Sequence, residues 1–190
     1  MAALEVRRDL PYAVVMTVLT LRPVARADAS DLIRANRDSR DYHAPWARPF
    51  TDPDGFDTWF AQCATGSAVG LVARHGGDGG VIGVFTLSQI VMGAFCSAYL
   101  GYYGMRAYAR RGLMTQALRL TLAHAFDELG LHRVEANIQP GNLASIALVR
   151  RAGFRQEGFS PRYLKIDGAW RDHERWARLS DDPVDDPVSG

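Results

Sequence analysis

Two adjacent arginines stand directly before a glycine at the predicted start of a long helix. The stretch from Tyr102 to Thr115 reads YYGMRAYARRGLMT, so a predicted strand ends, a short basic loop follows and a helix begins at Gly112. The first N–H groups of a helix lack intrahelical acceptors and carry partial positive charge, which attracts anions. Gly112 lets an anionic group approach the backbone closely. The spacing indicates a phosphate site at Arg110, Arg111 and the helix start, with a loop of merely solvated arginines as the alternative.

A second stretch places polar side chains where another predicted strand turns into a short helix. Residues 137–145 read NIQPGNLAS. Asn142 is suited to cap this helix, with Ser145 in its first turn, so capping is the structural alternative to a functional role. Glu135 and Asn137 alternate along the preceding strand and therefore share one of its faces. A carboxylate on such a face can take a proton from a substrate through water.

The elements that must position these segments form a mixed pattern. We expect strands at 17–21, 68–73, 81–87, 97–103, 134–138, 154–165 and 170–179, and helices at 28–37, 53–65, 112–129 and 142–151, with loop over 41–53. Residues 74–80 are too few for a crossover connection and predict a hairpin, and Asp167-Gly168 is a hairpin turn dipeptide. The order β-α-α-β-β-β-α-β-α-β-β indicates an α/β (α+β) fold with a mixed sheet.

Composition is that of an ordinary globular chain. Its 190 residues favour one domain, and 22 basic against 21 acidic residues give a net charge of +1, so nothing points to a nucleic-acid binder or a polybasic membrane binder. No apolar run is long enough to span a bilayer. We expect a single domain over residues 16–180, a weakly ordered extension over 1–15 and a disordered acidic tail over 181–190, with Met16 as a candidate start site. Two cysteines without metal-ligand spacing suggest free thiols in a reducing cytoplasm, and no metal.

Together the two polar segments resemble those of the GNAT superfamily of N-acetyltransferases. The resemblance rests on GLMT at 112–115, LHRVEAN at 131–137, NLAS at 142–145 and RAGF at 151–154, and it extends over roughly residues 19–179. It implies a GNAT-like fold, with a mostly antiparallel central sheet flanked by helices.

Two further stretches are similar to one branch of this superfamily. VMGAFCSAYLGY at 91–102 and YLKIDGAWRDH at 163–173 resemble the RimJ/RimL branch of ribosomal-protein alanine N-acetyltransferases. The chain departs from the family pattern at Ala109, where relatives carry Gln or Arg, and at Arg110, where many carry Gly. Leu164 stands where RimL-type enzymes have a glutamate, so that base is absent, as in the RimJ pattern.

The resemblance implies acetyl-CoA as the donor substrate. The backbone of residues 110–115 would hold its pyrophosphate, and the strand end at 103–106 would pair with pantetheine where it diverges from 134–138. Asn142 would reach pantetheine, Ser145 would face the sulfur, and Arg150 or Arg151 would lie near an adenosine phosphate. The implied cofactor-binding residues are Tyr103, Met105, Arg106, Arg110, Arg111, Gly112, Leu113, Met114, Thr115, Asn142, Ser145 and Arg151.

On the acceptor side the expectations are less specific. Glu135, Asn137 and Ser145 are the catalytic candidates, although Glu135 has the alternative of an ion pair with Arg133 or Arg106. The candidates for contact with the acceptor are Tyr42, Trp46, Tyr163 and His173.

The sequence thus predicts a cytoplasmic N-acetyltransferase, monomeric or homodimeric. Its expected acceptor is the N-terminal alanine of a ribosomal protein, whose amine attacks acetyl-CoA directly in a ternary complex. Two alternatives stay open: acetylation of a small-molecule or peptide-antibiotic amine, and a CoA-binding module without turnover.

Overall fold

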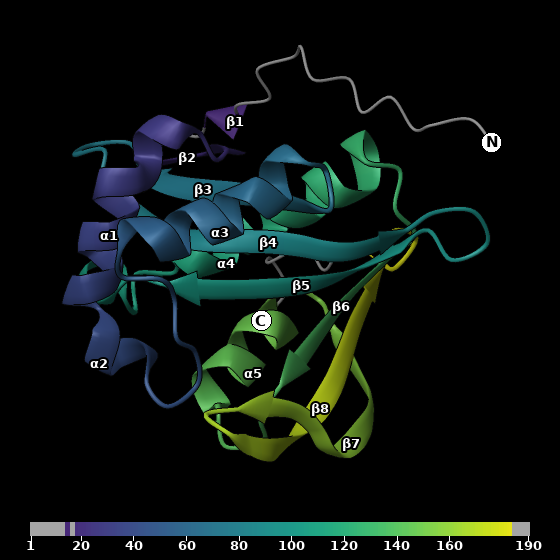
Figure 1. Ribbon diagram of the computed structural model, residues 1–190. Helices are drawn as coiled ribbons and strands as arrows, with labels where there is room; N and C mark the ends of the chain where they lie inside the picture. Colours follow the sequence, from purple (N-terminus) through teal and green to yellow (C-terminus); the bar gives the residue numbers. More distant parts are fainter. Residues whose placement is uncertain (1–13, 16–17, 184–190) are drawn as a thin grey trace.

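One mixed sheet organises the chain. The structure, a computed structural model, describes residues 14–15 and 18–183, which form an eight-stranded sheet of order β1-β2-β3-β4-β5-β6-β8-β7 (Figure 1). The strands are β1 (Val14–Val15), β2 (Leu19–Pro23), β3 (Ala68–His75), β4 (Val81–Val91), β5 (Ser97–Gly104), β6 (Arg133–Ile138), β7 (Arg155–Ile166) and β8 (Ala169–Leu179). All neighbouring strands are antiparallel except β5 and β6, so the predicted mixed, mostly antiparallel sheet is confirmed.

Helices cover both faces of the sheet. They are α1 (Ala29–Asp38), α2 (Arg40–His43), α3 (Pro53–Ala64), α4 (Leu113–Ala123) and α5 (Leu143–Arg151), with 3-10 turns η1 (Arg26–Asp28) and η2 (Arg106–Tyr108) and a π-helical turn η3 (His124–Glu128). On β3, Gly70 faces Trp59 of α3, whereas on β4 Gly83 faces Met114 of α4 on the opposite side. Within the described ranges no helix has the length and apolar content needed to cross a bilayer.

Local signals explain where several elements begin. The Asp52 side chain accepts a hydrogen bond from the Gly55 N–H at 2.8 Å and so caps α3, as predicted. Asn142 caps α5 in the same way, through a 3.1 Å bond from the Ser145 N–H. Asp167 and Gly168 have φ of 51° and 77°, the conformation that a two-residue hairpin turn requires between β7 and β8.

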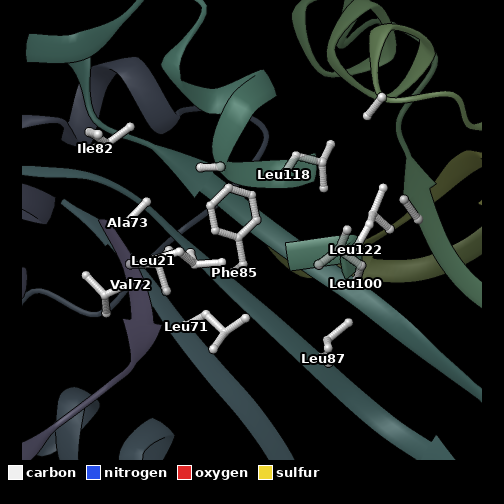
Figure 2. Close-up of a cluster of buried hydrophobic side chains, with 14 of the residues drawn as sticks. Leu21, Leu71, Val72, Ala73, Ile82, Phe85, Leu87, Leu100, Leu118 and Leu122 are labelled. Atoms are coloured by element: carbon white, nitrogen blue, oxygen red, sulfur yellow. The ribbon is translucent and has the colours of Figure 1, made fainter. Parts of the chain in front are cut away.

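The main core lies between α4 and the central strands. Phe85 of β4 is fully buried, and Figure 2 shows its ring near Leu118 of α4. Residues 81–85 are buried without alternation because helices cover both faces of β4. This packing fixes α4, and therefore its first turn, against the middle of the sheet.

Strands β5 and β6 separate after a short contact. Their parallel pairing covers only Ser97–Arg133, Ala98–Val134 and Tyr99–Glu135. Beyond it β5 continues to Gly104 along β4, and β6 continues to Ile138 along β8. Figure 1 shows the two strands diverging toward α5. The facing backbone edges of residues 100–104 and 136–138 therefore have no strand partner in the described part of the chain, and we call the space between them the strand gap.

Two predicted elements differ from the structure. The helix expected over 112–129 is α-helical only to Ala123 and continues as the π-helical turn of η3, while Gly130, with φ of 65°, follows as a C-terminal glycine. Apolar spacing cannot separate these turns, since both bury neighbours three to five residues apart. The loop expected over 41–53 begins with the short helix α2, whose residue His43 is buried.

Contacts occur at both ends of the predicted domain. Val14 and Val15 pair with Leu21 and Thr20 as strand β1, so the extension expected over 1–15 contributes to the sheet at its end. At the other terminus the Asp182 carboxylate accepts a hydrogen bond from the Leu179 N–H at 2.9 Å, so the tail expected from residue 181 starts within the fold. The rest of both predictions, over residues 1–13, 16–17 and 184–190, lies outside the described residues.

Candidate active site

The basic loop enters α4 through two residues with positive φ. Arg110 has φ of 60°, and Gly112, the N-cap of α4, has φ of 73° and ψ of −7°. No side chain caps this helix end, so its first N–H groups stay available to a ligand. Arg110, Arg111 and Gly112 are all exposed. This arrangement presents two cations and unpaired donors on one surface, as an anionic ligand requires.

The start of this loop is fixed by the surrounding elements. The Met105 N–H donates to the Ile82 carbonyl at 2.8 Å, and the Arg106 N–H donates to Ser39 Oγ at 3.2 Å. Met114, in the first turn of α4, packs so closely on β5 that a Cβ at Gly104 would lie 3.0 Å from its sulfur. The buried side chains of Met105 and Leu113 belong to the core. The Met105 carbonyl also accepts a hydrogen bond from the Tyr108 N–H, so of these two predicted cofactor residues only Leu113 has a backbone N–H to offer.

A hydrogen bond joins the two sides of the strand gap. Tyr102 Oη on β5 lies 2.5 Å from Ser145 Oγ in the first turn of α5. Burial raises the pKa of Tyr102 to about 12, so its phenol is protonated at neutral pH. Tyr102 was not among the residues predicted from sequence. The available signal was its position: adjacent strand residues face opposite sides, so Tyr102 faces α4 and α5 when Tyr103 faces α1 and α2.

Tyr103 lies on the α1–α2 side of the sheet. Its ring packs edge-on against His43 at 5.2 Å between centroids, and His43 Nε2 lies 2.9 Å from the Gly104 carbonyl oxygen. Burial lowers the pKa of His43, so the neutral ring donates through Nε2. Burial also raises the pKa of Tyr103. His43 therefore fixes the end of β5 in a way that the sequence alone did not show.

Glu135 is held in an ion pair. Arg133 Nε lies 2.8 Å from Glu135 Oε1, and the same guanidinium contacts Glu157 of β7. The alternative of a pair with Arg133 is thus confirmed. Glu135 is opposite Tyr99 on β5, and a hydrogen bond with Tyr163 together with burial raises the pKa of Tyr99 to about 12. Glu135 therefore shares the face of the sheet on which Tyr99 lies.

Asn137 follows on the same face of β6, and its Oδ1 is buried without a hydrogen-bond partner among the described residues. An unpaired buried acceptor is costly, so a donor from a ligand would be favourable here. The Tyr163 and His173 rings lie 6.0 Å apart on the last hairpin. His173 is only 2% exposed and its Nδ1 lies 3.0 Å from the Arg171 carbonyl oxygen, which leaves Tyr163 as the more accessible of the two.

The segment after α2 borders the gap from the acceptor side. Trp46 covers Gly141 in the β6–α5 turn, since a Cβ at Gly141 would lie 2.9 Å from its ring. Further along, Arg48 Nε lies 2.5 Å from Asp167 Oδ1 in the β7–β8 turn. Tyr42, which lies in α2 just before this segment, is 46% exposed. The segment over residues 44–50 therefore reaches both turns that flank the end of the gap.

Arg151 lies at the far end of α5 from Ser145. It ends α5, six residues or ~9 Å along the helix from Ser145. Its carbonyl accepts a 2.9 Å hydrogen bond from Arg119 Nη2 of α4. It lines a cavity of about 620 Å³ between the C-terminal ends of α4 and α5, away from the strand gap.

Comparison with known proteins agrees with this geometry. Residues 18–155 match the acetyltransferase (GNAT) domain family. The [ribosomal protein uS5]-alanine N-acetyltransferase of Escherichia coli (strain K12) is 33% identical over 164 residues, which cover 82% of this chain and 84% of that protein. The YjcK protein of Bacillus subtilis (strain 168) is 43% identical over 55% of this chain, and the match spans 58% of its length.

Two solved structures are similar over most of their length. The ribosomal-protein-S5-alanine acetyltransferase from Vibrio fischeri superposes with a TM-score of 0.79 at 26% identity, covering 90% of this chain and 97% of that one. Mycobacterium smegmatis RimJ, in complex with CoA-disulfide, gives 0.77 at 32% identity, covering 88% and 87%. With the family match over most of the chain, these similarities show that the protein belongs to the GNAT family of N-acetyltransferases.

Proposed function

We propose that this protein transfers an acetyl group from acetyl-CoA to the N-terminal alanine of a ribosomal protein. The observation that carries the proposal is the strand gap, which opens beside the uncapped, arginine-flanked start of α4. An extended chain with amide groups can pair with a free strand edge, and an attached diphosphate needs an anion site at a fixed distance from it. Acetyl-CoA has both parts.

The residues present suit this donor. The backbone of residues 110–115 and the guanidinium groups of Arg110 and Arg111 would hold the diphosphate. Of the backbone at Tyr103–Arg106, the part around Tyr103 would pair with pantetheine, since the N–H groups of Met105 and Arg106 already bond to Ile82 and Ser39. Asn142 and Ser145 would flank the end of the pantetheine. A Cβ at Gly112 would have no described protein atom within 4 Å, so there is room for an anion beside this glycine. Arg151 would reach only the adenosine end.

Transfer requires one proton to leave the amine and one to reach the sulfur. The amine nitrogen bonds to the acetyl carbon as the carbon–sulfur bond breaks, and the sulfur leaves as a thiol. Ser145 and Tyr102 form a short hydrogen-bonded pair at the gap, so Ser145 can pass a proton to sulfur and regain one from Tyr102, whose phenol then takes a proton from solvent water. Glu135 would assist proton removal from the amine through water, with Asn137 Oδ1 accepting a hydrogen bond from the acceptor.

The acceptor class is supported by the relatives rather than by the gap itself. The Escherichia coli relative acts on an alanine of ribosomal protein uS5. An α-amino group has a pKa of ~7.7–8.0 against ~10.4 for lysine, so it needs little help to become a nucleophile. That agrees with a site whose nearest carboxylate, on Glu135, is already paired with Arg133.

An acceptor screen tests the proposal. Thiol release from acetyl-CoA would be followed with peptides starting in alanine, the same peptides with a blocked N-terminus, polyamines and aminoglycosides. We expect turnover with the free alanine peptides and none with the blocked ones. Turnover with small amines only would contradict the acceptor, and CoA binding without turnover on any amine would indicate the binding module.

A further inference from the structure

One tyrosine attaches the phosphate-side loop to the β3–β4 turn. Tyr108 donates its hydroxyl hydrogen to Asp78 Oδ1 at 2.6 Å. The same oxygen accepts a 3.0 Å bond from the Gly80 N–H and lies 3.0 Å from His75 Nδ1. The bond from Tyr108, followed by that from Gly80, lowers the pKa of Asp78 to about 2, so the carboxylate is charged at neutral pH. The turn thus offers a fixed anionic acceptor for the phenol.

The ring of Tyr108 makes a second contact, toward the start of α4. The Arg111 Cζ lies 5.5 Å from the ring centroid, within the range of a cation–π interaction. Arg111 stands between Arg110 and Gly112, whose positive φ values set the direction of the chain on both sides. Tyr108 therefore touches the turn through its hydroxyl and the cationic side of the phosphate site through its ring.

Tyr108 lies between the core and a cavity. It is 8% exposed, and its ring centroid lies 5.3 Å from that of His75. A cavity of about 690 Å³ lies between α1, the β3–β4 turn and η2, and Tyr108, Asp78 and Gly80 line it. A Cβ at Gly80 would lie 2.0 Å from Tyr108 Oη, so the phenol reaches Asp78 only because residue 80 is glycine. The ring of Tyr108 is held by the core and by His75, and the hydrogen bond to Asp78 fixes where its hydroxyl end points.

We infer that Tyr108 is a positioning residue for the acetyl-CoA diphosphate: anchored by Asp78, it holds the Arg111 guanidinium at the start of α4. This inference rests on the proposed function, because it concerns how the phosphate site of that donor is ordered. Tyr108 need not touch the donor, since it acts through Arg111.

The test measures CoA affinity by calorimetry together with steady-state kinetics. Tyr108→Phe keeps the ring and loses the bond to Asp78, and we expect CoA to bind about fivefold more weakly. Tyr108→Leu also loses the ring, which should cost a further factor of about three. Gly80→Ala should resemble Tyr108→Phe by displacing the phenol. The loss should fall on KM for acetyl-CoA and spare kcat. Asp57→Asn, in an exposed ion pair with Arg26, is the control with unchanged affinity.

A double substitution separates positioning from general stability. In an Arg111→Ala background Tyr108→Leu should weaken CoA binding no further, because its target is gone. An additive loss there, or unchanged affinity in both Tyr108→Phe and Gly80→Ala, overturns the inference while the proposed function stands. Failure of the unmodified protein to bind CoA removes the proposed function, and this inference with it.

Discussion

Tyr102 on β5 and Ser145 on α5 share a 2.5 Å hydrogen bond across a gap that no backbone hydrogen bond spans. Because the pKa of Tyr102 is raised to about 12 by burial, the pair holds an available proton throughout the neutral range. A buried proton donor beside a departing thiolate is most useful when that thiolate is a poor leaving group.

Tyr102→Phe should therefore lower kcat by about 10- to 100-fold, at the low end of general-acid effects. Ser145→Ala should cost a similar factor, and the double variant should be hardly worse, since both residues act in one relay. With an acetyl thioester whose thiol is more acidic than that of CoA, kcat of Tyr102→Phe should be closer to kcat of the unmodified protein. Full kcat in Tyr102→Phe with acetyl-CoA would show that the phenol has only a structural role.

Gly112→Glu should abolish CoA binding. It places a side chain and a negative charge at the helix start where the diphosphate is proposed to lie, and it strains a backbone with φ of 73°. Gly130→Glu is the matched control, because Gly130 has φ of 65° and open space around it but follows the other end of the helix. Calorimetry should show binding lost in the first variant and kept in the second; equal affinities would rule out this anion site.

Glu135→Gln should lower activity by about tenfold or less on an alanine-starting peptide. The Glu135 carboxylate is paired with Arg133, and an α-amino group is already partly neutral near pH 7.5. Glu157→Gln, which removes another partner of the same arginine, controls for the loss of the ion pair. The pH–rate profile is decisive: activity absent at every pH with folding intact would make Glu135 an essential base.

Asp28→Asn should destabilise the fold by about 3 kcal/mol at neutral pH, since it leaves Arg22 and Arg74 without their shared partner. Burial by itself would raise the pKa of Asp28, but hydrogen bonds from Arg22, the Ala25 N–H and Arg74 outweigh it and lower the pKa to about 2. The folded state thus binds this proton less readily than the unfolded state. The stabilisation is complete above the unfolded pKa of ~3.9 and disappears as pH falls toward 2.

Thermal melts from pH 7 to pH 2 check this. The difference in Tm between the unmodified protein and Asp28→Asn should be constant above pH 5. It should become smaller as the pH falls below 4. Asp57→Asn should change Tm little, because the Arg26–Asp57 pair is exposed. A difference that persists unchanged at pH 2 would contradict the assignment.

Much of the fold was predictable because helix caps and turns depend on residues close together in the sequence. Asp52 before Pro53, Asn142 at its helix start and the Asp167-Gly168 turn each act within a few residues, and the structure has all three where the sequence placed them. The two arginines of the proposed anion site could also be found this way. Their loop is contiguous, so its chemistry can be read without knowing the sheet.

The remainder depends on contacts between distant segments. The Tyr102–Ser145 pair joins residues 43 positions apart and exists only because β5 and β6 separate at that point. Trp46 on Gly141 and Asp78 on Tyr108 are likewise tertiary contacts of ordinary residue types. At the start of the predicted acidic tail, composition likewise does not show that Asp182 accepts a hydrogen bond from the Leu179 N–H.

Truncation distinguishes the predicted C-terminal boundary from the observed one. A chain ending at Ser180 should melt several degrees lower, because it loses the hydrogen bonds that Asp182 and Pro183 make with Arg178 and Leu179. A chain ending at Pro183 keeps them and should melt with the full-length protein. Equal Tm values for both truncations would mean that these bonds add no stability.

Because the contact between β5 and β6 is short, acetyl-CoA bound as proposed would also hold the two parts of the sheet together. In the described chain, three residue pairs of the strands and the hydrogen bonds from the His132 and Arg133 N–H groups to the Cys96 carbonyl join a five-stranded half, β1 to β5, to a three-stranded half, β6 to β8. A substrate that pairs with both free edges extends this connection and ties the halves together. Amide hydrogen exchange on either side of the gap should then slow when CoA is added, and the two halves should unfold as one unit only in its presence.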